Sequence, residues 1–271
     1  MKIIATDLDR TLLPNGNHKI DKNAYSIFKK EIKKNNIMLI FVTGRSKKQV
    51  KESMKKYDIP KPQYIITDVG TKIYKYENNK MLQMSSWNEV LENDWEKLRG
   101  EKINALLSDV DGLQLQEKAK LNDFKQSYYT KILKNPDLLR EEIMALLKKN
   151  NVPSTVVYSV DVNKGVGLLD VMPKSGNKNA ALKFLIKKLK VKKSDVLYSG
   201  DSGNDLSLLA SDYSGILVKN ASDDVKRRLE KYRKEKNAKN EIYIAQGKDG
   251  LNGNYVSGII EGARHFGFFG N

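Results

Sequence analysis

Two aspartates follow the first apolar segment of the chain. Residues 2–6 are short and rich in β-branched types, which predicts a buried strand, and Asp7-Leu8-Asp9 comes next. Residues two apart on extended backbone point to the same side, so both carboxylates face one place. Like charges held this close need a cation or a shared proton between them. The pattern suits a metal-assisted reaction with one carboxylate as nucleophile and the other as acid and base.

The same residues also fit a solvated turn or a helix cap, so other segments must decide between these interpretations. Asp109-Val110-Asp111 repeats the Asp-x-Asp pattern in the middle of the chain. No partner segments of the right type follow it, and we predict a loop there.

Two further segments suit an anion. Thr43-Gly44-Arg45 follows an apolar run over 37–42 and precedes a helix that Ser46 and Gln49 open as a capping box. A strand–turn–helix of this kind presents backbone N–H groups and the Thr43 hydroxyl to an anion, although an ordinary turn has the same sequence. Lys178 stands at the start of a helix over 179–189, where the macrodipole disfavours a cation. Such a broken local rule is typical of a functional position, but lysine is common throughout this chain.

The fourth segment is Gly200-Asp201-Ser202-Gly203-Asn204-Asp205, directly after an apolar strand over 196–199. Asp205 alone fits a helix cap, whereas Asp201 precedes a glycine turn and needs another explanation. In a parallel sheet all four segments lie at the carboxyl ends of strands, where such sheets bind ligands.

The elements that position these segments alternate between strand and helix. Strands are expected over 2–6, 37–42, 64–67, 71–76, 196–199, 216–218 and 242–245, with helices over 22–35, 179–189, 204–210, 223–235 and a last one near 256–260. Between them, helices over 87–98 and 136–150 and strands near 124–131, 154–161 and 167–171 do not alternate strictly. The pattern predicts an α/β fold: a doubly wound, Rossmann-like parallel sheet core over 1–81 and 173–271, with an inserted α+β domain over 82–172.

Composition limits the chemistry. The chain has 271 residues, no cysteine and two histidines, which excludes disulfides and thiolate sites and disfavours a histidine-rich zinc site. Oxygen ligands point to Mg²⁺ or a similar hard cation. There is no membrane-spanning apolar run and no signal-peptide pattern, so we expect a cytoplasmic protein without a membrane partner.

The formal net charge of +16 raises nucleic acid as a partner. Only eight of the 49 basic residues are arginine, however, and the lysines are scattered over amphipathic helices. We therefore expect no nucleic acid partner, while the positive charge favours a phosphate ester.

Together, DLDRT, TGR, the downstream lysine and GDSGND resemble the haloacid dehalogenase superfamily of phosphohydrolases over the whole chain. The insert resembles the cap of its type II members. Softer matches resemble the sucrose-phosphate phosphatase branch, over 67–74, 124–128, 218–221 and 265–269. Arg10 departs from the Gly or Asn that is more usual in the superfamily, and 248–254 resembles a glycine-rich insertion.

The resemblance implies roles for particular residues. Asp7 attacks phosphorus, and Asp9 protonates the leaving oxygen and then activates water. Mg²⁺ is held by Asp7, the Asp9 backbone carbonyl, Asp201 and Asp205. The phosphoryl oxygens are held by Thr43, Gly44, Lys178 and Asn204. Candidate substrate contacts are Arg45, Lys125, Ser127, Tyr128 and Asp170.

Several functions stay open at this point. The favoured one is a Mg²⁺-dependent phosphatase for a sugar phosphate, with sucrose 6-phosphate first and another hexose, aminosugar or glycosylglycerate phosphate second. A phosphomutase fits less well. A non-catalytic basic binding protein on the same core is the alternative from a different class. We expect a monomer or weak homodimer.

Overall fold

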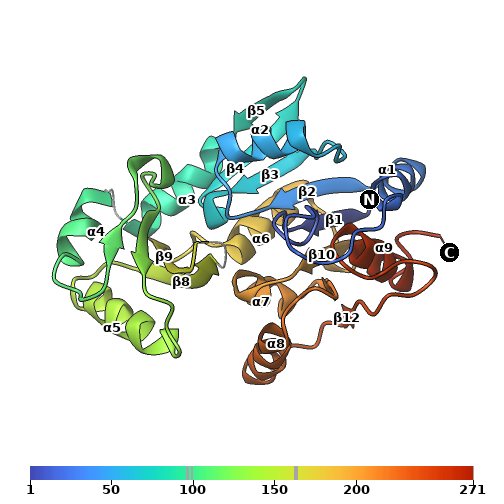
Figure 1. The fold of residues 1–271 in the computed structure, drawn as a ribbon. Helices are drawn as coiled ribbons and strands as arrows, with labels where there is room; N and C mark the ends of the chain where they lie inside the picture. Colours follow the sequence, from blue (N-terminus) through green and yellow to red (C-terminus); the bar gives the residue numbers. More distant parts are fainter. Residues whose placement is uncertain (96–97, 99, 162–163, 271) are drawn as a thin grey trace.

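The computed structural model describes residues 1–95, 98, 100–161 and 164–270. In this part of the chain, eight strands form one sheet in the order β12-β11-β10-β1-β2-β3-β4-β5 (Figure 1). Their bounds are β1 Ile3–Thr6, β2 Met38–Val42, β3 Tyr64–Thr67, β4 Lys72–Glu77, β5 Lys80–Gln83, β10 Val196–Gly200, β11 Ser214–Leu217 and β12 Ile242–Ile244. From β12 to β3 the neighbours pair in parallel.

The edge formed by β4 and β5 differs from the expectation. β4 pairs antiparallel with β3, because a short turn instead of a helix joins them. β5, which was not predicted, pairs with β4 through a hairpin at Asn78 and Asn79. Both asparagines have positive φ (50° and 60°), the backbone that a tight hairpin turn requires.

Helices cover both faces of the large sheet, as a doubly wound fold requires. Ile4 and Phe41 pack in one apolar cluster with Phe28 and Ile259, while Ile3 and Leu182 belong to the other. The first face carries α1 Ala24–Lys34, α2 Lys47–Lys56 and α9 Val256–His265, and the second carries α6 Lys178–Leu189, α7 Leu206–Leu209 and α8 Asp223–Glu235.

A second sheet lies between β5 and α6 in the chain. Among the described residues it has four antiparallel strands in the order β6-β7-β9-β8, namely β6 Gln114–Leu115, β7 Gln126–Thr130, β9 Val166–Pro173 and β8 Ser154–Asp161. Its helices are α3 Ser85–Trp95, α4 Gly100–Leu106 and α5 Pro136–Lys149. Ile103 of α4 and Ile143 of α5 are buried in one cluster with Tyr128 and Leu169 of the sheet. Figure 1 shows α4 and α5 on the side of this sheet that faces away from the large sheet.

The second sheet differs from the expectation in detail. α4 and β6 were not predicted, and the last turn of the helix expected over 87–98 includes positions 96 and 97, which lie outside the described residues. The predicted limits of the insert at 82 and 172 fall inside β5 and β9, so the division into two domains stays a prediction. Asp109 and Asp111 are exposed in turns, as predicted for that segment. None of the described helices combines the length and the apolar character needed to cross a membrane.

Candidate active site

The four predicted segments meet at one edge of the large sheet. Asp7 follows β1, Thr43 follows β2, and Asp201 follows β10, so each stands at the carboxyl end of a strand. Lys178 is the first residue of α6, which Asn177 caps by accepting a hydrogen bond from the backbone N–H of Ala180. The parallel pairing of β1 with both β2 and β10 is what brings these ends together.

Lys178 lies at the centre of the site and is almost completely buried. Its Nζ donates hydrogen bonds to Asp7 Oδ1 at 2.7 Å, to Asn204 Oδ1 at 2.8 Å and to Asp205 Oδ1 at 2.8 Å. All three donors of the ammonium are thereby used, so its position is fixed by Asp7 after β1 and by the two adjacent residues Asn204 and Asp205.

Asp205 is fully buried and accepts five hydrogen bonds. Oδ1 accepts from Lys178 and from the Tyr198 hydroxyl, and Oδ2 accepts from the backbone N–H groups of Asp201 and Ser202 and from the Ser202 hydroxyl. Gly200 leaves the room for this carboxylate, because an added Cβ would come within 2.6 Å of Asp205 Cγ. Asp205 therefore orders the loop that carries Asp201.

Asp7, Asp201 and Asp205, which we call the acidic cluster, form a possible cation site. One carboxylate oxygen from each lies within 4.8 Å of the others. Asp201 Oδ1 accepts a hydrogen bond from the Thr11 hydroxyl, and Arg10 Nε lies 3.5 Å from Asp201 Oδ2. Three carboxylates against the charges of Lys178 and Arg10 still leave an excess of negative charge, which a divalent cation with a preference for oxygen would compensate.

The pKa values of these groups follow from burial and charge. Burial raises the pKa of Asp7 well above its ordinary value, against the opposing effect of Lys178. Burial and Asp205 raise the pKa of Asp201 to about 7, although Arg10 opposes this. Burial alone would lower the pKa of Lys178, but the carboxylates of Asp205 and Asp7 outweigh it and raise that pKa. Lys178 therefore stays positively charged, and the carboxylates beside it are costly to ionise unless another cation binds.

The Asp9 carboxylate does not join the acidic cluster. Arg45 donates two hydrogen bonds to this carboxylate, from Nε to Oδ2 at 2.8 Å and from Nη2 to Oδ1 at 2.6 Å. Asn15 Nδ2 also donates to Asp9 Oδ1, and Arg45 Nη1 donates to the Ser53 hydroxyl at 2.6 Å. Sequence reasoning placed Arg45 among the substrate contacts and did not foresee this pair.

Thr43 and Gly44 follow β2, the neighbour of β1, and Asn204 contacts Lys178. Thr43 is buried, and its hydroxyl accepts a hydrogen bond from the backbone N–H of Arg45 at 3.1 Å. Gly44 is exposed, and an added Cβ would meet only Val69 at an ordinary contact distance of 3.8 Å. Asn204 Oδ1 accepts from Lys178 and from the Ser202 hydroxyl. The turn and the amide offer donors to an anion at this edge, and the ammonium adds a positive charge.

A strained turn beside the cluster was not foreseen. Asp68, Val69 and Gly70 have φ values of 51°, 61° and 108°, and a β-branched residue rarely adopts this backbone. The turn donates from the Asp68 and Val69 N–H groups to the carbonyl oxygens of Arg45 and Thr43. At Gly70 a Cβ would lie 2.5 Å from the backbone nitrogen of Lys178. The turn therefore holds two site segments together, and the signal in the sequence was Asp68 at the end of a predicted strand.

The second sheet carries a buried polar group that we call the polar trio: Lys125, Ser127 and Asp170. Lys125 Nζ donates to Ser127 Oγ at 2.9 Å, and Ser127 Oγ donates to Asp170 Oδ1 at 2.5 Å. Ser127 and Asp170 are direct partners across β7 and β9. Burial raises the pKa of Asp68, and the charges of Lys125 and Asp170 also act on it, so the trio lies near the strained turn.

Tyr128 is not brought to the polar trio. Side chains alternate along β7, and Tyr128 points to the opposite face, where its hydroxyl donates to Asn104 Oδ1 of α4 at 2.6 Å. The trio thus lies on the sheet face that α4 and α5 leave uncovered.

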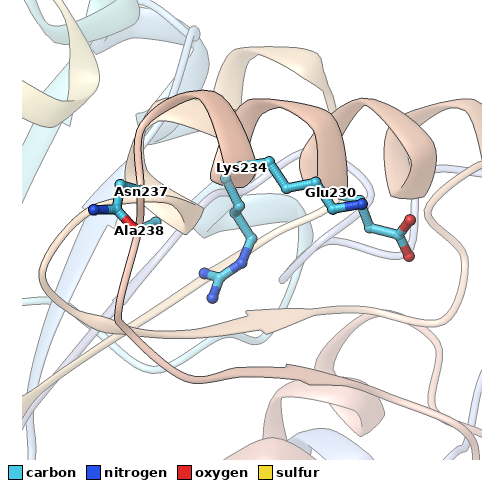
Figure 2. A pocket seen from close by; sticks show the side chains of 5 residues that line it. Glu230, Lys234, Asn237 and Ala238 are labelled. Carbon is cyan, nitrogen blue, oxygen red and sulfur yellow. The ribbon is translucent and has the colours of Figure 1, made fainter.

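The second sheet also approaches the core site directly, because β8 contacts the turn Gly203–Asp205. A surface hollow of about 550 Å³ lies elsewhere, at the end of α8 (Figure 2). It is lined by Glu230, Arg233, Lys234, Asn237 and Ala238, which take no part in the acidic cluster or the polar trio.

Comparison with known proteins shows the family of this chain. A family model described as sucrose-6F-phosphate phosphohydrolase matches residues 1–267. A putative HAD-like hydrolase of Nitrosococcus oceani is 35% identical over 97% of this chain and 71% of its own length. Probable sucrose-phosphatase 2 of Arabidopsis thaliana is 30% identical over 97% of this chain, which spans 59% of that protein.

A solved structure shares the fold. The sucrose-phosphatase of Synechocystis sp. PCC6803, in complex with sucrose and phosphate, has a TM-score of 0.79 and 24% sequence identity, covering 100% of this chain and 99% of that one. This structural likeness confirms the predicted fold class, and the family model and the relatives confirm the predicted resemblance. The chain belongs to the sucrose-6F-phosphate phosphohydrolase family and is a haloacid dehalogenase type sugar phosphatase, a hydrolase of phosphoric monoesters.

Proposed function

We propose that this chain is a Mg²⁺-dependent phosphatase that hydrolyses sucrose 6-phosphate through an aspartyl-phosphate on Asp7. The observation that carries the proposal is the buried contact of Asp7 with Lys178 beside Asp201 and Asp205. The family model and the plant relative, a probable sucrose-phosphatase, support sucrose 6-phosphate as the substrate.

In the first step an Asp7 oxygen attacks phosphorus, and the bond from phosphorus to the sugar oxygen breaks. Asp9 gives its proton to that leaving oxygen. In the second step Asp9 takes a proton from water, whose oxygen attacks phosphorus and releases inorganic phosphate and free Asp7. In the free structure both Asp9 oxygens accept hydrogen bonds from Arg45, so Asp9 must leave this pair to act as an acid.

The other core residues supply charge and position. Lys178, Asn204, Thr43 and Gly44 hold the phosphoryl oxygens, where the transition state spreads negative charge. Asp7, Asp201 and the Asp9 backbone carbonyl hold Mg²⁺, with Asp205 ordering the loop or adding a ligand. The close, buried, oxygen-only donor set fits this ion. When bound, Mg²⁺ neutralises part of the negative charge, which lets one anion approach another.

We further propose that residues 82–172 form a cap whose polar trio contacts the sugar. Lys125, Ser127 and Asp170 are buried, carry both donors and acceptors, and lie on the face of the second sheet opposite α4 and α5. Sugar hydroxyls can replace their mutual hydrogen bonds without leaving a buried group unpaired. Arg45 is a further candidate contact once it releases Asp9.

The test is Mg²⁺-dependent phosphate release from sucrose 6-phosphate, glucose 6-phosphate, fructose 6-phosphate and glucosamine 6-phosphate, with Asp7→Asn as the blank. We expect kcat/KM for sucrose 6-phosphate to exceed the others by at least about tenfold, ~1.4 kcal/mol. Equal activity on all four sugar phosphates would be consistent with the proposed reaction but would overturn the assignment of sucrose 6-phosphate as the substrate. A chain that binds nucleic acid in a salt-dependent way and releases no phosphate would overturn both.

A further inference from the structure

Arg10 brings a second cation to the acidic cluster. Its Nε lies 3.5 Å from Asp201 Oδ2, and its Nη2 donates to the backbone oxygen of Asn220 at 3.3 Å. The Asp201 side chain is 3% exposed, whereas the Arg10 side chain is 37% exposed. The guanidinium therefore stands between a buried carboxylate and the surface of the site.

The backbone at Arg10 is built to hold this position. Its φ is 57°, a left-handed conformation that a residue with a Cβ rarely adopts. The Arg10 N–H donates to Asn15 Oδ1 at 2.7 Å, and its carbonyl oxygen accepts from Asn220 Nδ2 at 2.7 Å. Asn220 is itself buried and accepts from the Tyr255 N–H at 2.8 Å. Residues far apart in the chain thus fix the backbone position of Arg10.

The ion pair with Asp201 places a positive charge near this carboxylate without a hydrogen bond from Arg10 Nε. Among the described residues, the buried Arg10 Nε has no hydrogen-bond partner, and it lies 3.5 Å from the nearer Asp201 oxygen. The contrast in the same site is Arg45, which holds Asp9 with two short hydrogen bonds. Asp201 therefore stays available to a metal ion, while the positive charge of Arg10 stays near it.

A positive charge at this place acts on the two charged ligands in opposite directions. It repels a divalent cation from the acidic cluster, and it attracts the phosphoryl dianion. We propose that Arg10 is a positioning residue that sets this balance, weakening Mg²⁺ binding and strengthening phosphate binding. This inference rests on the proposed function, since it takes the acidic cluster as the place where both bind.

The experiment compares the full-length wild type with Arg10→Asn and Arg10→Lys by calorimetric titration at pH 8, above the pKa of about 7 to which Asp201 is raised. MgCl₂ is titrated alone, and inorganic phosphate is titrated at saturating Mg²⁺. Asn tolerates the left-handed backbone, so Arg10→Asn removes the charge with little strain. We expect Arg10→Asn to bind Mg²⁺ about tenfold tighter and phosphate about tenfold weaker, and Arg10→Lys to behave like the wild type.

Lys231→Gln is the matched control, because it removes one positive charge from a side chain that is 80% exposed on α8. It should leave both affinities unchanged. If Arg10→Asn does not fold, Arg10→Gly gives the same prediction, since glycine suits φ of 57°. Affinities that stay unchanged, or that both fall, would overturn the inference and leave the proposed function standing. A wild type that binds neither Mg²⁺ nor phosphate would overturn the proposed function itself.

Discussion

The acidic cluster and the polar trio are both buried polar groups in contact with a lysine, yet they are built differently. Asp7 and Lys178 are 171 residues apart in the chain, and the cluster is assembled from the ends of separate strands and the start of a helix. The trio comes from two neighbouring strands and the residue before one of them, and its members bond mainly to one another. The cluster is held from many directions, whereas the trio can exchange its partners.

This difference separates two tasks. A site that stabilises a transition state must be rigid before the substrate arrives. A site that selects a sugar must trade its internal hydrogen bonds for bonds to hydroxyl groups. Changes in the cluster should therefore lower the turnover of every phosphate ester, and changes in the trio should alter only the binding of particular sugars.

Asp7→Asn has the largest expected effect. It removes the attacking oxygen anion, so phosphate release from every ester should fall by at least about 10⁴-fold, ~5.5 kcal/mol. Thermal unfolding should show no loss of stability, because the change removes one buried negative charge from a cluster with an excess of them.

Asp109→Asn is the control for this variant. It changes the same residue type in the similar Asp-x-Asp pattern, which lies exposed in a turn. Normal activity is expected there. Normal activity in Asp7→Asn would remove Asp7 from the mechanism.

Asp9→Asn should come second. General acid–base catalysis contributes roughly 10²–10⁴-fold, so phosphoryl transfer from a sugar phosphate should slow by that factor. The burst of nitrophenol from 4-nitrophenyl phosphate should slow much less, because this leaving group departs without a proton. Equal losses for the two substrates, measured by rapid mixing, would show that Asp9 acts on structure and not as an acid.

The order of these effects could be argued from sequence because Asp7, Thr43, Lys178 and Asp201 stand next to strong strand or helix signals. The carboxyl ends of parallel strands lie at one edge of the sheet. Residues that directly follow such strands in the sequence are therefore expected to lie close together in space. The capping box of Ser46 and Gln49 was confirmed for the same reason, since it depends only on local spacing.

What the sequence left open depends on side-chain direction and on distant partners. The pairing of Asp9 with Arg45 joins residues 36 apart, and no local pattern predicts it. The left-handed backbone of Val69 contradicts its residue type and exists only because neighbouring segments hold it. Tyr128 stands next to Ser127 in the chain, but pleating turns it to the opposite face, towards α4.

Asp201→Asn tests how the charge of the acidic cluster affects the stability of the chain. Because the pKa of Asp201 is raised to about 7, the native chain keeps a proton that the unfolded chain loses above pH 4. Without metal, the stability from this group is therefore present at low pH and lost as pH rises to about 7, by up to ~4 kcal/mol.

Chemical denaturation in EDTA across pH 4–8 measures this effect. Asp201→Asn should become more stable relative to wild type as the pH rises. Added Mg²⁺ at pH 8 should stabilise the wild type and have little effect on the variant. A constant difference between the two chains over this pH range would contradict the electrostatic account of the cluster.

Asp170→Asn should have a smaller and more selective effect. It weakens an acceptor of the polar trio, so KM for the preferred sugar phosphate should rise by about tenfold, or ~1.4 kcal/mol. Turnover of 4-nitrophenyl phosphate should not change. Tyr128→Phe, on the other face of β7, is the matched control and should leave both substrates unaffected. If Asp170→Asn changed the kinetics of both substrates equally, the proposal that the trio binds the sugar while the acidic cluster performs the chemistry would be wrong.

The central claim is that the buried cluster transfers the phosphoryl group to Asp7. The most direct measurement quenches a single turnover of the preferred sugar phosphate with acid and searches the peptides by mass spectrometry. We predict a phosphorylated peptide that carries the group on Asp7 in the wild type, and none in Asp7→Asn. Complete turnover without any phosphorylated Asp7 peptide, at quench times that span the reaction, would contradict the account.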